Sequence, residues 1–255
     1  MNLSGDQLAL TAFLVGSVLA GGNAVGVRFS NRELDPLWGA GLRFTLAAAV
    51  LLAVMPALRL VLPRGRALTG AVLYGALNFG AAFALAYYGF VRVHAGLGQT
   101  LLALVPLVTL FLAVAQREER FRIEALAGGV IALLGIGVLS APLGESAPLL
   151  SLLALLGSTV CFAQAAVVVR RFPDGHPITM NAVGMATAAV LLVAGSLFAG
   201  ESIVLPEQAE TWAALVYLIA IGSIVVFGLY VFVLRHWSAS RAAYTFVLVR
   251  REPAS

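Results

Sequence analysis

Residues 94–121 read HAGLGQTLLALVPLVTLFLAVAQREERF, and this stretch decides the class of fold. No charged residue occurs from Ala95 to Ala115, whereas a dense cluster of charges follows from Arg117 to Glu124. A helix rises about 1.5 Å per residue, so about 20 apolar residues are enough to cross a hydrocarbon core of roughly 30 Å. The stretch therefore predicts a membrane-spanning helix that ends in a polar loop.

Apolar runs of this length alternate with charged loops along the chain. Hydrophobic residues make up 61% of the 255 residues and charged residues only 11%, whereas a soluble domain has about 25% charged residues. So few charges cannot coat a soluble surface of this size, and lipid is the expected solvent for much of the chain. The eight predicted spans are Leu8–Val27, Pro36–Leu58, Leu68–Val91, Ala95–Ala115, Ala125–Leu143, Pro148–Val169, Pro177–Gly200 and Thr211–Leu234.

A ninth apolar run begins at Ala242 and stops at Val249, where the sequence RREPAS follows. A helix of this length rises only about 12 Å, less than half of the hydrocarbon core. We therefore expect an all-α fold, a polytopic membrane helix bundle with eight full spans and a partial ninth.

The arginines are distributed unevenly between the two sides of this predicted bundle. Ten lie in the loops after the even-numbered spans, and four lie on the other side or close to it. Cytoplasmic loops carry the excess of basic residues, so we expect the even-numbered loops and the N-terminus in the cytoplasm. These topology signals account for the net charge of +4, and we expect no nucleic-acid partner. Basic residues that are all arginine, with abundant Ala, Gly, Leu and Val, indicate a bacterial protein, and the expected location is the bacterial inner membrane.

Two parts of the sequence resemble each other weakly. The stretch from His94 to Pro106 aligns without gaps with Ser238 to Arg250, and small residues recur after the turn in both. The first two spans similarly echo the sixth and seventh. Because five spans is an odd number, two such halves insert with opposite orientations, as is typical of secondary transporters. We therefore predict two inverted five-helix repeats, residues 1–144 and residues 145–255, of which the second is incomplete.

Three stretches carry a resemblance to a known family. They are GGNAVGVRFSNRELDPLWGAGLRFTLAAAVLLAV (residues 21–54), HAGLGQTLLALVPLVTLFLAVAQREERF (residues 94–121) and SASRAAYTFVLV (residues 238–249). In their order and spacing the chain resembles EamA-type members of the drug/metabolite transporter superfamily. The resemblance implies ten spans in two inverted halves, and export or exchange of small metabolites, amino acids or drugs by alternating access.

The chain departs from the family pattern after Val249, where the family continues with a proline and another apolar run. The expectation is a C-terminally truncated form that inserts into the membrane but transports poorly. Two alternatives stay open: a truncated, non-transporting membrane protein such as a scaffold or subunit, and a membrane-embedded enzyme that acts on lipid. The enzyme is disfavoured because the sequence shows no nucleophile–base pair and no carboxylates that would face a cavity.

The charged residues give few signs of buried chemistry. No Asp or Glu lies inside a predicted span, and carboxylates within the membrane are the usual proton or sodium relays. Arg43 is the one charge well inside a span; we favour snorkelling to the headgroups or a packing role, with a substrate-anion role as the alternative. The three histidines lie far apart and lack the spacing of metal ligands. We expect no catalytic residues, no cofactor and no metal site.

Polar side chains within the spans are candidates for a substrate cavity between the halves. Each of them needs a partner in hydrocarbon, and hydrogen bonding between helices is the alternative role. The residues chosen for the cavity are Asn23, Asn78, Tyr87, Tyr88, Gln99 and Tyr230. The expected partners are a small-molecule substrate and the lipid bilayer. The oligomeric state stays open, with a homodimer as one alternative.

Overall fold

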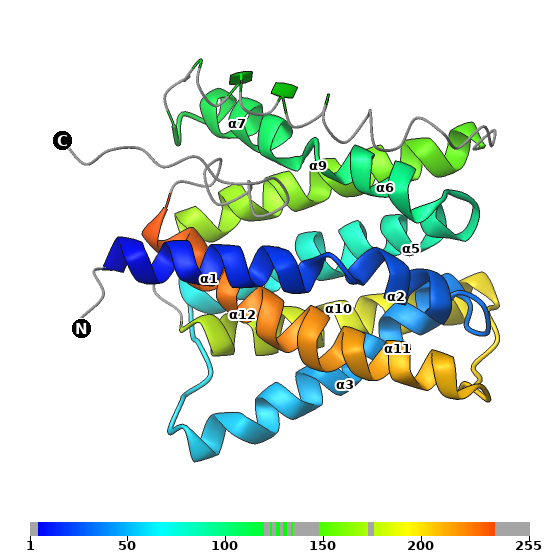
Figure 1. Cartoon of the computed structure of the whole chain (residues 1–255). Coiled ribbons are helices and arrows are strands. Elements are labelled where there is room, and N and C mark those ends of the chain that lie inside the picture. Colours follow the sequence, from blue (N-terminus) through cyan, green and yellow to red (C-terminus); the bar gives the residue numbers. More distant parts are fainter. Residues whose placement is uncertain are drawn as a thin grey trace.

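The computed structural model of the chain describes residues 5–119, 148–172 and 176–237, with a few isolated helical positions between 123 and 134. All regular structure in these residues is helical. Seven helical segments in this part of the chain are long and apolar enough to cross a membrane, and they form one bundle (Figure 1). They are Gln7–Ser30, Pro36–Ala57, Arg66–Arg92, Ala95–Ala115, Leu149–Arg171, Pro177–Ala199 and Ala209–His236.

Seven of the eight predicted spans are thereby confirmed as helices of membrane length. The predicted fifth span, residues 125–143, lies largely outside the described residues, and the partial ninth, residues 242–249, lies wholly outside them. The observed helices extend beyond the uncharged runs, since the first continues past Arg28 to Ser30 and the last begins before Glu210. Charged side chains are tolerated at these ends because they reach the water interface.

Several spans consist of two or three shorter helices. In chain order the elements are α1 (Gly5–Ala20), α2 (Asn23–Ser30), α3 (Pro36–Ala57), α4 (Arg66–Tyr74), η1 (Gly75–Ala81), α5 (Ala82–Arg92), α6 (Ala95–Leu102), α7 (Val105–Ala115), α9 (Leu149–Arg171), α10 (Pro177–Ala199), α11 (Ala209–Ile219), η2 (Ala220–Val225) and α12 (Val226–His236). The span of α6 and α7 breaks just ahead of Pro106, which occupies the first turn of α7. Proline is tolerated there because the first turn of a helix does not use its amide hydrogens.

The helices pack in recurring pairs. α3 lies along α10, α5 along α9, and α1 along α12, the last pair being visible at the front of Figure 1. The backbones approach closely between η1 and α10, where a side chain at Gly75 would overlap the backbone of Gly184. Small residues let helices approach in this way, and van der Waals packing is a main source of helix association in lipid.

Two of the spans contain a π-helical turn near their middle. η1 interrupts the span made of α4 and α5, and η2 interrupts the span made of α11 and α12. A π-turn interrupts the regular hydrogen-bond ladder of an α-helix and frequently occurs at functional sites. These two turns place Asn78 and Ser223 in the interior, with exposed fractions of 1% and 0%.

At one end of the bundle, acidic side chains accept hydrogen bonds from amides near helix starts. Glu201 accepts bonds from the amides of Leu37 and Trp38 in the first turn of α3, and Glu33 accepts one from the amide of Gln208 just before α11. The first amides of a helix lack partners within the helix, and negative charge is favourable there. The loop after α2 and the loop after α10 thereby hold each other.

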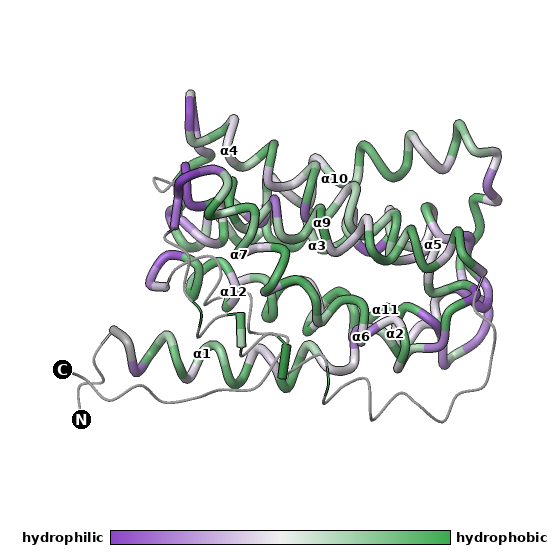
Figure 2. Tube along the Cα trace, turned by 90° about the horizontal axis from the view of Figure 1, so that it is seen from above, coloured by the Kyte–Doolittle hydropathy of each residue, from purple (hydrophilic) through white to green (hydrophobic). Residues whose placement is uncertain are grey.

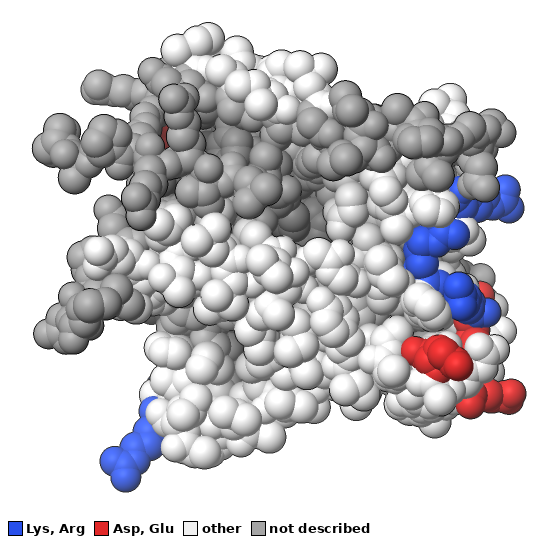
Figure 3. All heavy atoms as spheres, in the orientation of Figure 1, with Lys and Arg blue, Asp and Glu red and all other residues white. Residues whose placement is uncertain are grey.

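Most charged residues of the described chain lie at the two ends of the bundle. The hydrophilic segments of the trace lie at the helix ends, and the middle is largely hydrophobic (Figure 2). On the face drawn in Figure 3, the described arginines and acidic residues are at the ends and an uncharged band separates them. This band is the part that faces hydrocarbon. Arg43 is the exception, because it lies inside.

Candidate functional site

Arg43 is enclosed by the bundle, and its guanidinium is the centre of the candidate site. It follows Pro36, the first residue of α3, by about 10 Å of helix. Its side chain is 0% exposed. The side chain therefore does not reach the headgroups, as snorkelling would require, but meets partners on neighbouring helices.

Two polar side chains hold the guanidinium. Its Nε donates a hydrogen bond to Ser223 Oγ at 2.8 Å, and its Nη2 donates one to Asn23 Oδ1 at 3.1 Å. Ser223 in turn donates to the carbonyl oxygen of Leu218 at 2.8 Å. These bonds join α2 and α3 to η2, although Arg43 and Ser223 are 180 positions apart in the sequence.

Aromatic rings flank the same guanidinium. Cζ of Arg43 lies 4.8 Å from the ring centre of Phe83 and 5.1 Å from that of Phe44. A cation–π contact contributes about 2 kcal/mol when it is desolvated. Placing an arginine at the centre of a membrane helix costs about 2.5–3.5 kcal/mol on insertion scales, so the rings and the two hydrogen bonds offset this cost.

One side of the guanidinium faces the Tyr87 hydroxyl, and the two groups interact. Nη1 of Arg43 and the hydroxyl oxygen of Tyr87 are both buried, and neither has a well-formed hydrogen bond to any other described residue. The backbone of Tyr87 is fixed by Asn31, whose Nδ2 donates to its carbonyl oxygen at 3.0 Å. Within the described part of the chain, no carboxylate pairs with Arg43.

Gly222 makes room for this arrangement. A Cβ atom at this position would overlap Oδ1 of Asn23 and would lie 3.1 Å from Nη2 of Arg43. Any larger residue would therefore push the two partners apart. The glycine that precedes Ser223 is part of what positions the buried arginine.

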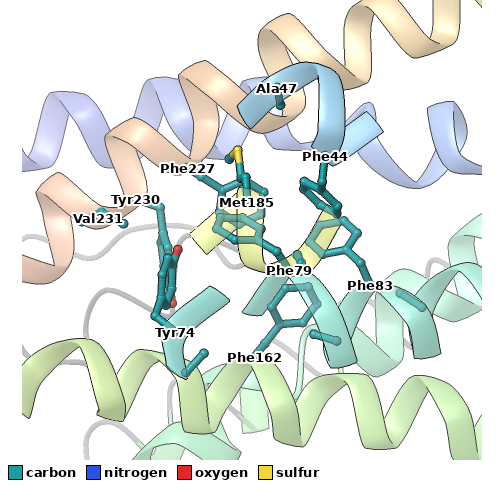
Figure 4. Close-up of a cluster of buried hydrophobic side chains, with 14 of the residues drawn as sticks. Phe44, Ala47, Tyr74, Phe79, Phe83, Phe162, Met185, Phe227, Tyr230 and Val231 are labelled. Carbon is teal, nitrogen blue, oxygen red and sulfur yellow. The ribbon is translucent and has the colours of Figure 1, made fainter. Parts of the chain in front are cut away.

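Next to the arginine, aromatic rings from both parts of the chain fill the interior (Figure 4). Phe79 meets Phe227 edge to face, with ring centres 4.7 Å apart, and Phe83 meets Phe162 in the same way at 5.4 Å. Such pairs contribute about 0.5–1.5 kcal/mol each beyond the burial of their surface. The cluster therefore connects η1 and α5 firmly to α9 and α12 in this conformation.

Unpaired polar atoms also occur in this region. The side-chain amide of Asn78 is buried, and neither its oxygen nor its nitrogen has a hydrogen-bond partner among the described residues. The Tyr74 hydroxyl is likewise unpaired among the described residues, and the ring of Tyr74 meets that of Phe79 edge to face, with ring centres 5.2 Å apart. A buried polar group without a partner costs about 1–3 kcal/mol. These atoms therefore mark positions where polar atoms of a ligand, or water, can bind.

The residues chosen from the sequence fall into two interior groups, in which only Asn23 is half-buried rather than buried, and two outliers. Asn23 and Tyr87 adjoin Arg43, and Asn78 and Tyr230 are buried in the region of the aromatic cluster. Tyr88 lies apart, because it is 45% exposed on α5. Gln99, also an outlier, is half-buried on α6, a helix that packs against α9, α2 and α5.

Arg43 and Ser223 are not among the residues chosen from the sequence. Arg43 does carry a signal there, as the one charge well inside a predicted span. Ser223 carries none, because a serine in an apolar run can bond to a carbonyl of its own helix. Its second partner, Arg43, depends on how distant spans pack.

The chemistry available at this site is hydrogen-bond donation to an anion or a polar group. Among the residues that the structure describes, no group of three or more His, Cys, Asp or Glu could hold a metal ion. The buried centre thus offers a guanidinium, hydroxyls and amides surrounded by rings.

A protein-family model matches most of this sequence. It is described as the EamA-like transporter family, and it matches residues 7–141 and residues 149–249. The boundary between the two matched segments falls between α7 and α9.

Individual proteins and a solved structure are also similar. An uncharacterized inner membrane transporter, YedA of Escherichia coli strain K12, is 29% identical over 224 residues, which are 87% of this chain and 72% of YedA. YedA of Escherichia coli O157:H7 matches to the same extent. The crystal structure of another protein superposes on this chain with a TM-score of 0.77. The alignment covers 93% of this chain and 83% of the other chain, and the two sequences are 19% identical. It shows that the fold is shared.

Proposed function

The chain belongs to the EamA-like transporter family, and we propose that it carries a small organic metabolite across a bacterial inner membrane by alternating access. The family and the transporter YedA point to a transporter rather than an enzyme. The observation that carries the proposal is the buried polar centre of Arg43, Asn23 and Ser223, which joins both matched segments within an apolar bundle. Ionisable residues inside membrane proteins mark substrate or ion pathways.

The two matched segments support a division into two inverted halves, residues 1–144 and residues 145–255. The packing supports it too, because α1 lies along α12 while α9, the first span of the second half, lies along α5. The spans in corresponding places each contain a π-turn, η1 in one half and η2 in the other. Inverted halves with the site at their interface are the usual architecture of secondary transporters.

Two features of the bundle would take part in movement between the halves: a contact without side chains and a pair of loops at one end. The close approach of Gly75 and Gly184 presents backbone without side chains, on which η1 and α10 can slide. The loops held by Glu33 and Glu201 close one end of the bundle. We place this end outside and the N-terminus in the cytoplasm, because the loops with most arginines lie at the opposite end.

A comparison of exported metabolites tests the function without knowledge of the substrate. Bacteria that express the chain, the Asn78→Ala variant or an empty vector are compared by mass spectrometry of cells and medium. We expect at least one small molecule to be redistributed by the wild type and less so by Asn78→Ala, at equal amounts in the membrane. Phe198→Ala is the control, since Phe198 is 93% exposed. A wild type that inserts normally but redistributes nothing would support a scaffold or subunit instead.

A reversible cross-link tests the alternating-access mechanism. Asp35 accepts a hydrogen bond from the amide of Ser202 at 2.8 Å, so these positions join the two loops at the closed end. The double variant Asp35→Cys/Ser202→Cys is made in a Cys161→Ala background. We expect oxidation to stop the transport found above and reduction to restore it, while each single-cysteine variant stays active. Transport that continues at full rate through a formed disulfide would contradict the mechanism.

A further inference from the structure

We propose that Arg43 and Tyr87 bind the carboxylate group of the transported molecule, so that the chain carries organic anions with an apolar body. This inference rests on the proposed transport function and names its substrate class. The observation behind it is a pair of buried neighbours, Nη1 of Arg43 and the Tyr87 hydroxyl, which interact with each other and with no other described hydrogen-bonding group.

The number of free donors fits a carboxylate. Nη1 of Arg43 carries two N–H donors and the Tyr87 hydroxyl carries one O–H donor. One N–H can point to the Tyr87 oxygen, which leaves a second N–H and the O–H without an acceptor among the other described residues. A carboxylate has two oxygens, and paired donors to both give strength and orientation. The remaining sides of the guanidinium are occupied, because Nε bonds to Ser223 and Nη2 to Asn23.

The charge fits as well. The guanidinium of an arginine stays protonated in proteins, and among the described residues no carboxylate compensates that of Arg43. An isolated charge is unfavourable in a low-dielectric interior, whereas an ion pair with good hydrogen bonds recovers much of the cost. An anionic substrate supplies the missing partner, and a cationic one is repelled.

The surroundings indicate the rest of the substrate. Phe44 and Phe83 flank the guanidinium and meet each other edge to face, with ring centres 4.9 Å apart. Phe79 and Phe227 extend the same cluster. A molecule whose carboxylate reaches Arg43 therefore places its remaining atoms against apolar and aromatic surface. The preferred class is a carboxylate with an apolar or aromatic body.

A purely structural role for Arg43 is the competing explanation. The bonds to Asn23 and Ser223 would suffice for that role, with the Tyr87 hydroxyl as a further neighbour of the guanidinium. The substitution Tyr87→Phe removes only this hydroxyl and keeps the ring. It therefore tests the hydroxyl alone and leaves the bonds of Arg43 to Asn23 and Ser223 in place.

The test measures binding to the purified full-length chain in detergent. The probes are phenylacetate and isovalerate, each paired with its uncharged amide, phenylacetamide and isovaleramide. We expect both acids to raise the melting temperature of the wild type and both amides to leave it unchanged, because a ligand that binds the native state stabilises it. Tyr87→Phe should weaken the binding of both acids about 10-fold or more, and Arg43→Lys, which lacks the forked donor, should also weaken it. Arg32→Gln is the matched control, since Arg32 is exposed and stacks on Phe29 at 4.1 Å.

Three results would overturn the carboxylate site. They are equal effects of acid and amide, no effect of any probe, or binding of the acids that is unchanged in Tyr87→Phe and Arg43→Lys. The metabolite comparison separates this failure from a failure of the transport function. If the wild type redistributes only compounds without an acidic group, the carboxylate site is wrong and the transport function stands. If it redistributes nothing, the transport function itself fails.

Discussion

Two spans of the bundle share a backbone feature but differ in the polar side chain that it buries. They are the span of α4, η1 and α5 and the span of α11, η2 and α12. Both are interrupted near the middle by a π-turn, and both π-turns bury a polar side chain. In the first span this is Asn78, whose amide has no hydrogen-bond partner among the described residues. In the second it is Ser223, which accepts a bond from Arg43 and donates one to Leu218.

This difference indicates that the two π-turns, η1 and η2, have different roles in this protein. Near η2 the polar group has partners, and the bond that Arg43 donates to Ser223 links the two matched segments. Near η1 the amide of Asn78 has no partner among the described residues. This lowers stability and leaves the amide available to a ligand. We therefore regard η2 as the anchored position and η1 as the open one.

The substitution Gly75→Ala in η1 should have the largest effect on stability. The added Cβ atom would overlap the backbone of Gly184, which cannot turn away as a side chain can. We expect a loss at the upper end of the range of about 1–3 kcal/mol found for overpacking, measured as unfolding in detergent. The matched control is Gly228→Ala in α12, where an added Cβ atom meets open space. Equal stabilities of the two variants would show that the helices do not approach so closely.

The substitution Ser223→Ala in η2 should have an intermediate effect. It removes the acceptor of the bond from Arg43 Nε and leaves that buried N–H unpaired. We expect a loss of about 1–2 kcal/mol in the same unfolding measurement. Ser17→Ala is the control, because Ser17 bonds only to the carbonyl oxygen of Phe13 in its own helix. A loss no larger than that of the control would remove the distinction between an anchored and an open π-turn.

The substitution Asn78→Leu should have the smallest effect on stability and a clear effect on transport. No hydrogen bond to a described residue is lost, so we expect stability to stay within about 1 kcal/mol of the wild type or to rise. Export of the redistributed metabolite should fall, because a polar position of the site is removed. Asn181→Leu is the contrast, since Asn181 donates a bond to the carbonyl oxygen of Phe227 and should lose stability. A comparable loss for Asn78→Leu would mean that its amide does have a partner.

The site could be predicted from the sequence only in part. Asn23, Asn78, Tyr87 and Tyr230 were selected because polar groups in hydrocarbon need partners, and all except Asn23 are at most 5% exposed. Tyr88 was selected by the same reasoning and lies at the surface. Adjacent residues of a helix point about 100° apart, so a tyrosine pair cannot face the same interior. Which of the two is buried follows from the packing of α5.

The sequence by itself determined that the chain crosses a membrane, and where most of its spans lie. Both follow from the number of consecutive apolar residues, a local property that needs no knowledge of neighbouring helices. Only the tertiary structure decided that Arg43 meets Ser223 across 180 positions, and that η1 and η2 interrupt their spans with a π-turn. In lipid every span is apolar, so hydropathy does not say which helices touch. Which helices touch is determined by the few polar groups and glycines, through hydrogen bonds and close packing. These interactions form only between helices that lie side by side, so the sequence of one span does not reveal them.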